Sequence, residues 1–66
     1  MNEIDGTKAV AAYMSTTEST LRYWRHIGVG PVSFKVGRRV AYRRSDVDAW
    51  LAIQYDQTAR GATSRE

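Results

Sequence analysis

Residues 32–42 are the part of this sequence that most constrains its fold, because apolar and polar side chains alternate there on both sides of a glycine. A period of two around a glycine predicts a β-hairpin. A three-residue loop at 37–39 would pair Val36 with Val40 and keep the apolar side chains on one face. A two-residue loop would pair Lys35 with Val40 and divide those side chains between two faces. The pattern therefore favours the three-residue loop.

Patterns typical of helices precede the hairpin. Residues 8–14 carry apolar side chains at spacing i, i+3 and i+4, which predicts a helix with Asp5 or Thr7 as its N-cap. A second helix is predicted to begin after Thr17, the better N-cap of its segment, and to continue to about His26. The turn between these short helices has the length expected in a helix-turn-helix motif.

A third helix is predicted after the hairpin. Ser45 as N-cap with Asp48 at the third helical position makes a capping box with Asp in place of Glu. Val47, Trp50 and Leu51 form the apolar face of this helix. The order helix, turn, helix, hairpin, helix predicts an α+β fold, a small winged helix-turn-helix with a two-stranded β-hairpin as the wing and a C-terminal helix.

A chain of 66 residues holds one domain at most, and its 42% hydrophobic and 26% charged residues fit a folded one. We expect residues 1–55 to form this domain, with residues 1–6 as a short leader and residues 56–66 as a flexible C-terminal tail. The predicted core residues are Val10, Tyr13, Met14, Leu21, Trp24, Ile27, Val32, Phe34, Val36, Val40, Tyr42, Val47, Trp50 and Leu51.

The basic residues are concentrated in one part of the chain. The net charge is +3, yet seven Lys or Arg residues and no Asp or Glu lie between Arg22 and Arg44. Such a block in a folded domain indicates a polyanionic partner, and a solvated basic face is the alternative. The second helix presents a polar face of Ser19, Arg22, Tyr23 and His26. The alternative interpretation of this face is a surface ion pair between Glu18 and Arg22, beside a tyrosine that binds nothing.

Several function classes are excluded by what the sequence lacks. It has no cysteine and one histidine, so neither a disulfide framework nor a metal-ligand cluster is expected. It shows no nucleophile–base pair and no phosphate loop, so we expect no enzyme, no catalytic residue and no cofactor. The longest apolar run, residues 9–14, is too short to cross a bilayer, and no signal-peptide pattern precedes it. These observations predict a cytoplasmic protein without a membrane partner.

Two stretches resemble known DNA-binding proteins. Residues 20–31, TLRYWRHIGVGP, are similar to the DNA-binding helix of the MerR superfamily. Residues 36–51, VGRRVAYRRSDVDAWL, are similar to the wing and last helix of small excisionases and AlpA-type proteins. Together the resemblance covers about residues 4–53 and implies a MerR-like winged-helix domain. Only 15 residues follow Leu51, so we expect neither the effector domain nor the long dimerising helix of a MerR activator.

The resemblance implies a small phage excisionase, or recombination directionality factor. Such a protein binds repeats in the attachment-site arms of double-stranded DNA, bends the DNA and directs a phage integrase toward excision, at the nucleoid of the bacterial host. Neighbouring protomers are expected to lie head to tail along the DNA. Eight of the ten basic residues are Arg, a bias that favours an actinobacteriophage source. An AlpA/MerR-like transcription regulator is one alternative, and a protein-interaction adaptor that uses Ile53 and Tyr55 is another.

The second helix is expected to enter the major groove, and the hairpin to reach the next minor groove. Base edges or nearby phosphates are expected to be contacted by Ser19, Thr20, Arg22, Tyr23 and His26. The DNA backbone is expected to be held by Thr17 and Arg25. In the wing, we expect the minor groove to be contacted by Arg38 and Arg39, and phosphates by Lys35, Arg43 and Arg44. About five neutralised phosphates predict a slope near −4 to −5 when log affinity is plotted against log salt concentration.

Overall fold

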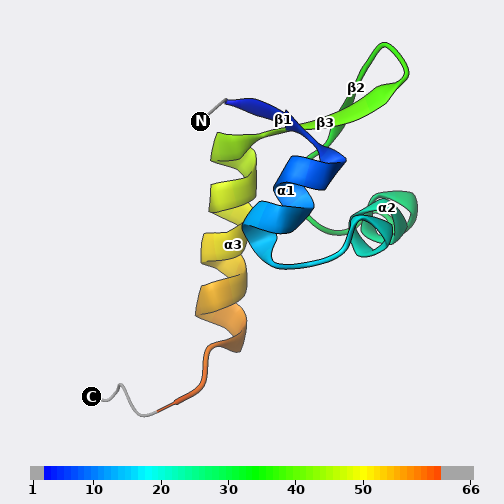
Figure 1. The fold of residues 1–66 in the computed structure, drawn as a ribbon. Helices are drawn as coiled ribbons and strands as arrows, with labels where there is room; N and C mark the ends of the chain where they lie inside the picture. Colours follow the sequence, from blue (N-terminus) through cyan, green and yellow to red (C-terminus); the bar gives the residue numbers. More distant parts are fainter. Residues whose placement is uncertain (1–2, 62–66) are drawn as a thin grey trace.

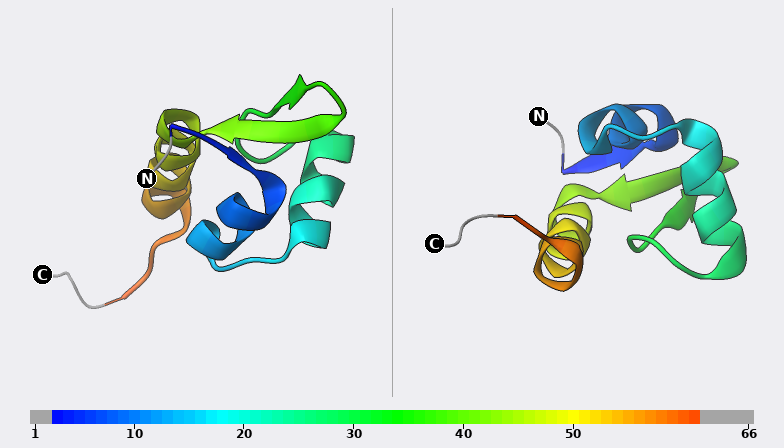
Figure 2. Two further views of the ribbon diagram at one scale, coloured as in Figure 1. Left: turned by 45° about the horizontal axis from the view of Figure 1, so that its top comes forward. Right: turned by 90° about the horizontal axis from the view of Figure 1, so that it is seen from below.

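The computed structural model describes residues 3–61. Its elements are, in order, β1 (Ile4–Gly6), α1 (Thr7–Met14), α2 (Glu18–Ile27), β2 (Phe34–Val36), β3 (Arg39–Arg43) and α3 (Arg44–Thr58) (Figure 1). This order confirms the predicted α+β winged helix-turn-helix. In Figure 1, α1 lies between α2 and α3 and the β2–β3 hairpin extends beyond the helices, and the right view of Figure 2 shows α1 and α3 on opposite sides of β3.

The sheet contains a strand that the sequence did not predict. It is antiparallel and three-stranded, in the order β1-β3-β2, so β3 is its central strand. The interpretation of residues 1–6 as a leader is therefore wrong for residues 4–6, which pair with residues 41–43. A strand of three residues carries no periodicity of its own, and β1 exists because β3 offers it a free edge.

The hairpin register also differs from the prediction. Lys35 lies opposite Val40, and a two-residue loop joins the strands. The prediction was wrong because it gave weight only to the alternation of side chains. Gly37 has a φ of 61°, the left-handed value required at the first central position of a type II′ turn, and this turn closes a two-residue loop. As a result, Val36 lies opposite Arg39 rather than Val40, and its side chain is exposed.

The core brings together one or two residues from each helix and from the central strand. Its buried members are Val10 and Ala11 of α1, Leu21 of α2, Tyr42 of β3 and Val47 of α3. Four further predicted core residues pack against them half-buried, namely Met14, Trp24, Val40 and Leu51. The prediction of a core position is wrong for four residues that are exposed, namely Tyr13, Ile27, Val32 and Val36. The two remaining ones, Phe34 and Trp50, are half-buried, and Trp50 packs against Trp24 with 5.3 Å between the ring centroids.

The N-caps of α1 and α3 differ from the predictions. Gly6 rather than Asp5 or Thr7 is the N-cap of α1. Helix α3 begins directly after β3, so Ser45 lies inside it and caps nothing. Instead, the Ser45 hydroxyl donates to a carboxylate oxygen of Glu3 at 2.6 Å, and the backbone carbonyl of Glu3 accepts from the Arg44 N–H at 2.6 Å. The strand–helix junction is thus stabilised by the N-terminal segment.

Helix α3 is longer than predicted. It continues through Thr58, so the first residues of the predicted tail belong to the helix. The rest of that predicted tail, residues 62–66, lies outside the described residues. None of the helices within residues 3–61 is long and apolar enough to cross a membrane.

A half-hidden ion pair joins the first strand to the third helix. An Arg44 guanidinium nitrogen lies 2.5 Å from a carboxylate oxygen of Asp5, and the two side chains are only 12% and 15% exposed. The same guanidinium lies 3.8 Å from the centroid of the Tyr13 ring. The Asp5 hydrogen bond raises the pKa of Arg44 above its ordinary value. This pair joins β1 to the start of α3, in addition to the backbone pairing of β1 with β3.

Replacing Asp5 by asparagine is expected to lower the melting temperature by about 5 °C or more, because the change leaves the Arg44 charge without its partner in a shielded place. The matched control is Asp56→Asn, which removes the same charge from an exposed position of α3. Thermal unfolding followed by circular dichroism checks the difference. Equal melting temperatures for the two variants would contradict a stabilising role for the ion pair.

Glu3 makes the junction sensitive to acid. The Ser45 hydroxyl that donates to its carboxylate holds the pKa of Glu3 below its ordinary value of 4.5, with further help from the Ser45 N–H and the charge of Arg43. A carboxylate with a lowered pKa stabilises the folded state fully above its unfolded pKa, and that contribution is lost as the pH falls through the folded pKa. The melting temperature of the native chain should therefore exceed that of Glu3→Gln above the ordinary pKa of 4.5, and the difference should shrink as the pH falls below that value. A constant difference across this range would be the opposite result.

Candidate nucleic-acid interface

Helices α1 and α2 form the two arms of a helix-turn-helix. The turn between them starts at Ser15, whose φ of 59° is left-handed, and the Thr16 N–H donates to the Ala11 carbonyl at 2.9 Å. These features end α1 sharply and reverse the chain. Helix α2 then lies at the edge of the fold, with one side against α1 (Figure 1).

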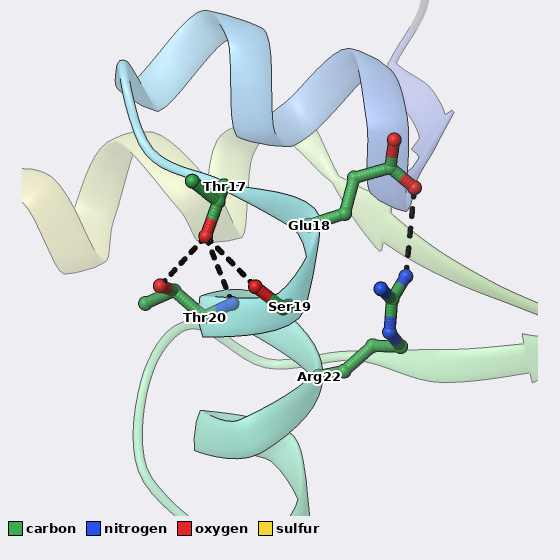
Figure 3. Close-up of polar contacts among 5 residues, drawn as sticks. All are labelled: Thr17, Glu18, Ser19, Thr20 and Arg22. Atoms are coloured by element: carbon green, nitrogen blue, oxygen red, sulfur yellow. Dashed lines mark hydrogen bonds and ion pairs between the residues drawn. The ribbon is translucent and has the colours of Figure 1, made fainter.

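Thr17 holds the beginning of α2, as predicted. Its hydroxyl oxygen accepts from the Thr20 N–H at 3.1 Å, which confirms Thr17 as the N-cap. The Thr17 hydroxyl also shares hydrogen bonds with the hydroxyls of Thr20, at 2.8 Å, and Ser19, at 3.2 Å (Figure 3). Three of the predicted DNA-binding residues therefore form one local cluster of hydroxyl groups.

The polar side of α2 is exposed. Leu21 is buried on the inner side, whereas Ser19, Arg22, Tyr23, Arg25 and His26 are all exposed. We call the surface formed by Ser19, Tyr23 and His26 the outer face of α2. The last turn of α2 carries Arg25 and His26, and positive charge there is favoured by the helix dipole.

The alternative surface pair on α2 is also present. An Arg22 guanidinium nitrogen lies 3.5 Å from a Glu18 carboxylate oxygen (Figure 3). The two side chains are 62% and 43% exposed, so solvent screens the pair and it constrains Arg22 only weakly. Arg22 is therefore able to exchange Glu18 for another anion.

The wing separates the two arginines that the sequence placed together at its tip. Arg38 lies in the loop of the hairpin and is exposed. Arg39 is the first residue of β3, and one of its guanidinium nitrogens reaches the start of α1, where a Cβ added to Gly6 would lie 3.4 Å from it. The tip thus presents one arginine, and Arg39 lies against the body of the domain.

The remaining cations of the wing also divide into two kinds. Lys35 is exposed on β2, and Arg43 is exposed at the end of β3, 3.6 Å from Glu3. Arg44 is engaged by Asp5 and Tyr13, so its guanidinium is not free for a phosphate. We therefore leave Arg44 out of the candidate interface.

One cation near this surface was missed by the sequence analysis. Lys8, in the first turn of α1, lies beside a hollow that Arg22 and Arg39 also line. The sequence signal was weak, because Lys8 stands outside the basic block and only the fold brings it to the other two. Within residues 3–61 no group of three or more His, Cys, Asp or Glu side chains is placed to hold a metal ion.

Comparison with known families agrees with this geometry. A family model described as a helix-turn-helix domain matches residues 6–54, which include α1, α2, the hairpin and most of α3. No curated protein matches the chain.

Proposed function

Since this chain belongs to the helix-turn-helix domain family and is thus a small DNA-binding protein, we propose that it is an excisionase. In this proposal it recognises repeats in attachment-site DNA, bends the DNA and directs an integrase toward excision. The observation that carries sequence-specific binding is the uncovered outer face of α2 beside a basic wing. The similarity of residues 36–51 to small excisionases supports the recombination role.

The dimensions of the two elements fit adjacent grooves. Helix α2 has 10 residues and is about 15 Å long, and its diameter with side chains, about 10–12 Å, matches the roughly 12 Å width of the major groove. With the outer face of α2 toward the base edges, Ser19, Tyr23 and His26 are available for hydrogen bonds and for contact with thymine methyl groups. Arg38 at the wing tip then reaches the neighbouring minor groove, and Lys35 and Arg43 lie near its phosphates.

One such module covers little DNA, so specific binding requires several copies. Head-to-tail contacts between identical protomers build an open array rather than a closed dimer. An array on direct repeats would bend the DNA along its length, because each protomer follows the groove of the one before it. This is the arrangement that would remodel an attachment site for an integrase.

A gel mobility-shift titration tests this proposal on three duplexes of equal length, namely the attachment-site arms, the promoter of the same gene and a random sequence. We expect a ladder of discrete complexes on the arms alone. A single complex on the promoter alone would contradict the excisionase role and point to a transcription regulator. Equal binding to all three duplexes would contradict sequence-specific recognition altogether.

Tyr23 provides a test at the level of one side chain. It is 60% exposed on α2, and Tyr55 is 68% exposed on α3, so alanine at either position should leave folding unchanged. We expect Tyr23→Ala to weaken binding to the attachment-site arms about ten-fold, the loss of one contact of roughly 1.4 kcal/mol. Tyr55→Ala should bind as the native chain does. Fluorescence anisotropy with labelled duplex measures both affinities, and the reverse order of effects would mean that DNA meets α3 rather than the outer face of α2.

A further inference from the structure

Three cations from distant parts of the sequence meet at one hollow on the surface. Lys8 comes from α1, Arg22 from α2 and Arg39 from the start of β3. The hollow has a volume of about 330 Å³, which exceeds that of a phosphate group. Glu18 is the one acidic residue in its lining, so the group carries an excess of positive charge.

The backbone leaves room for Arg39 to reach this place. A Cβ added to Gly6 would lie 3.4 Å from an Arg39 guanidinium nitrogen, at the close end of ordinary van der Waals contact. The guanidinium therefore lies at the start of α1. Among the described residues no side chain caps α1 and no acidic residue occupies its first turn, so the positive end of the helix dipole adds to the same region.

The free protein does not neutralise this group of charges. Within residues 3–61, Arg22 has the Glu18 carboxylate at 3.5 Å, and neither Lys8 nor Arg39 forms an ion pair. Like charges gathered at one site repel one another, and an anion among them relieves that repulsion. The hollow borders the outer face of α2, since Arg22 follows Ser19 by three residues and precedes His26 by four, so DNA in the proposed position brings its backbone past it.

We propose that Lys8, Arg22 and Arg39 together hold one backbone phosphate of DNA, which anchors α2 in the groove. This inference rests on the proposed DNA binding and adds a specific contact to it. Arginine recognises phosphate through paired hydrogen bonds, and lysine recognises it as a point charge. Glu18 is the counter-ion that the phosphate displaces from Arg22 on binding.

Neutral methylphosphonate linkages provide the test. A series of duplexes carries the bound site, each with a single phosphate replaced. The proteins are the native chain, Lys8→Gln, Arg39→Gln, and two controls with cations outside the hollow, Lys35→Gln and Arg38→Gln. We expect one position at which the replacement weakens the native protein about ten-fold. At that position the replacement should weaken the binding of both hollow variants less than about three-fold. It should weaken the binding of the two controls as much as that of the native chain.

The outcomes separate this inference from the proposed function. If the native protein binds the site and both hollow variants respond to every phosphate replacement as strongly as it does, the shared phosphate is wrong but the proposed function stands. If Lys8→Gln becomes insensitive at one position and Arg39→Gln at another, the shared phosphate is also wrong, because the two cations would then hold separate phosphates. Native protein that binds no duplex in a fixed register contradicts the proposed function as well.

Glu18→Gln gives a second readout that a structural role would not produce. Removing the competing carboxylate should tighten binding to the native duplex about two- to five-fold. The gain should disappear on the duplex that lacks the anchoring phosphate. Weaker binding by Glu18→Gln, in protein shown to be folded by circular dichroism, would overturn the role of the hollow as an anion site.

Discussion

Replacing Leu21 by alanine is expected to remove about 2–5 kcal/mol from the free energy of unfolding. Leu21 is 1% exposed and is the buried residue through which α2 joins the core. A chain of 66 residues has a total stability of roughly 3–10 kcal/mol, so the loss is a large part of the whole. Urea unfolding followed by circular dichroism measures it.

Val32→Ala is the control for this substitution. Val32 is 63% exposed, and its truncation should change the free energy of unfolding by no more than about 0.5 kcal/mol. If Leu21→Ala proved as stable as Val32→Ala, the packing of α2 described above would be incorrect. The same pair of variants also separates loss of DNA binding through unfolding from loss through a missing contact.

The affinity for DNA is expected to fall about 250- to 1,000-fold when the salt concentration rises from 50 to 200 mM. This follows from a slope of about −4 to −5 in log affinity against log salt, since about five phosphates are neutralised and each releases condensed counter-ions. Equilibrium titrations at four or five salt concentrations measure the slope. Arg38→Gln should make the slope shallower by about 1. Arg60→Gln, which removes a charge beyond α3, should leave it unchanged. A slope near zero would mean that the basic block does not meet the DNA backbone.

The sequence predicted best what depends on neighbouring residues. Thr17 caps α2 through the N–H of Thr20, a contact three residues away, and the pattern of Leu21 against Tyr23 needs only the helical period. The order of elements also needed only local patterns, and it was enough to predict the fold class. These features depend only on residues that are close together in the sequence.

The features that could not be predicted depend on residues far apart in the sequence. Strand β1 forms only because β3 lies beside it. Asp5 pairs with Arg44 at the start of α3, whereas Arg43 at the end of β3 is exposed, so a count of basic residues could not separate the two arginines. The register was predictable in principle, because Gly37 signals a tight turn, but the alternation of apolar residues pointed the other way.

The candidate site follows the same division. The outer face of α2 was predicted, because Ser19, Tyr23 and His26 are set by the period of one helix. The hollow was not, because Lys8 and Arg39 meet only once β3 and α1 have packed together. A basic block in a sequence therefore indicates a polyanionic partner, while the fold decides which cations act together.

The central claim is that DNA meets the outer face of α2 and the tip of the wing. Titration of ¹⁵N-labelled protein with a short duplex of the attachment-site arm, followed by heteronuclear NMR, tests it most directly. The account predicts that the amide signals of Ser19, Tyr23, His26 and Arg38 shift, while those of Ile53 and Tyr55 stay in place. Shifts confined to α3 around Ile53 and Tyr55, with α2 unchanged, would contradict it.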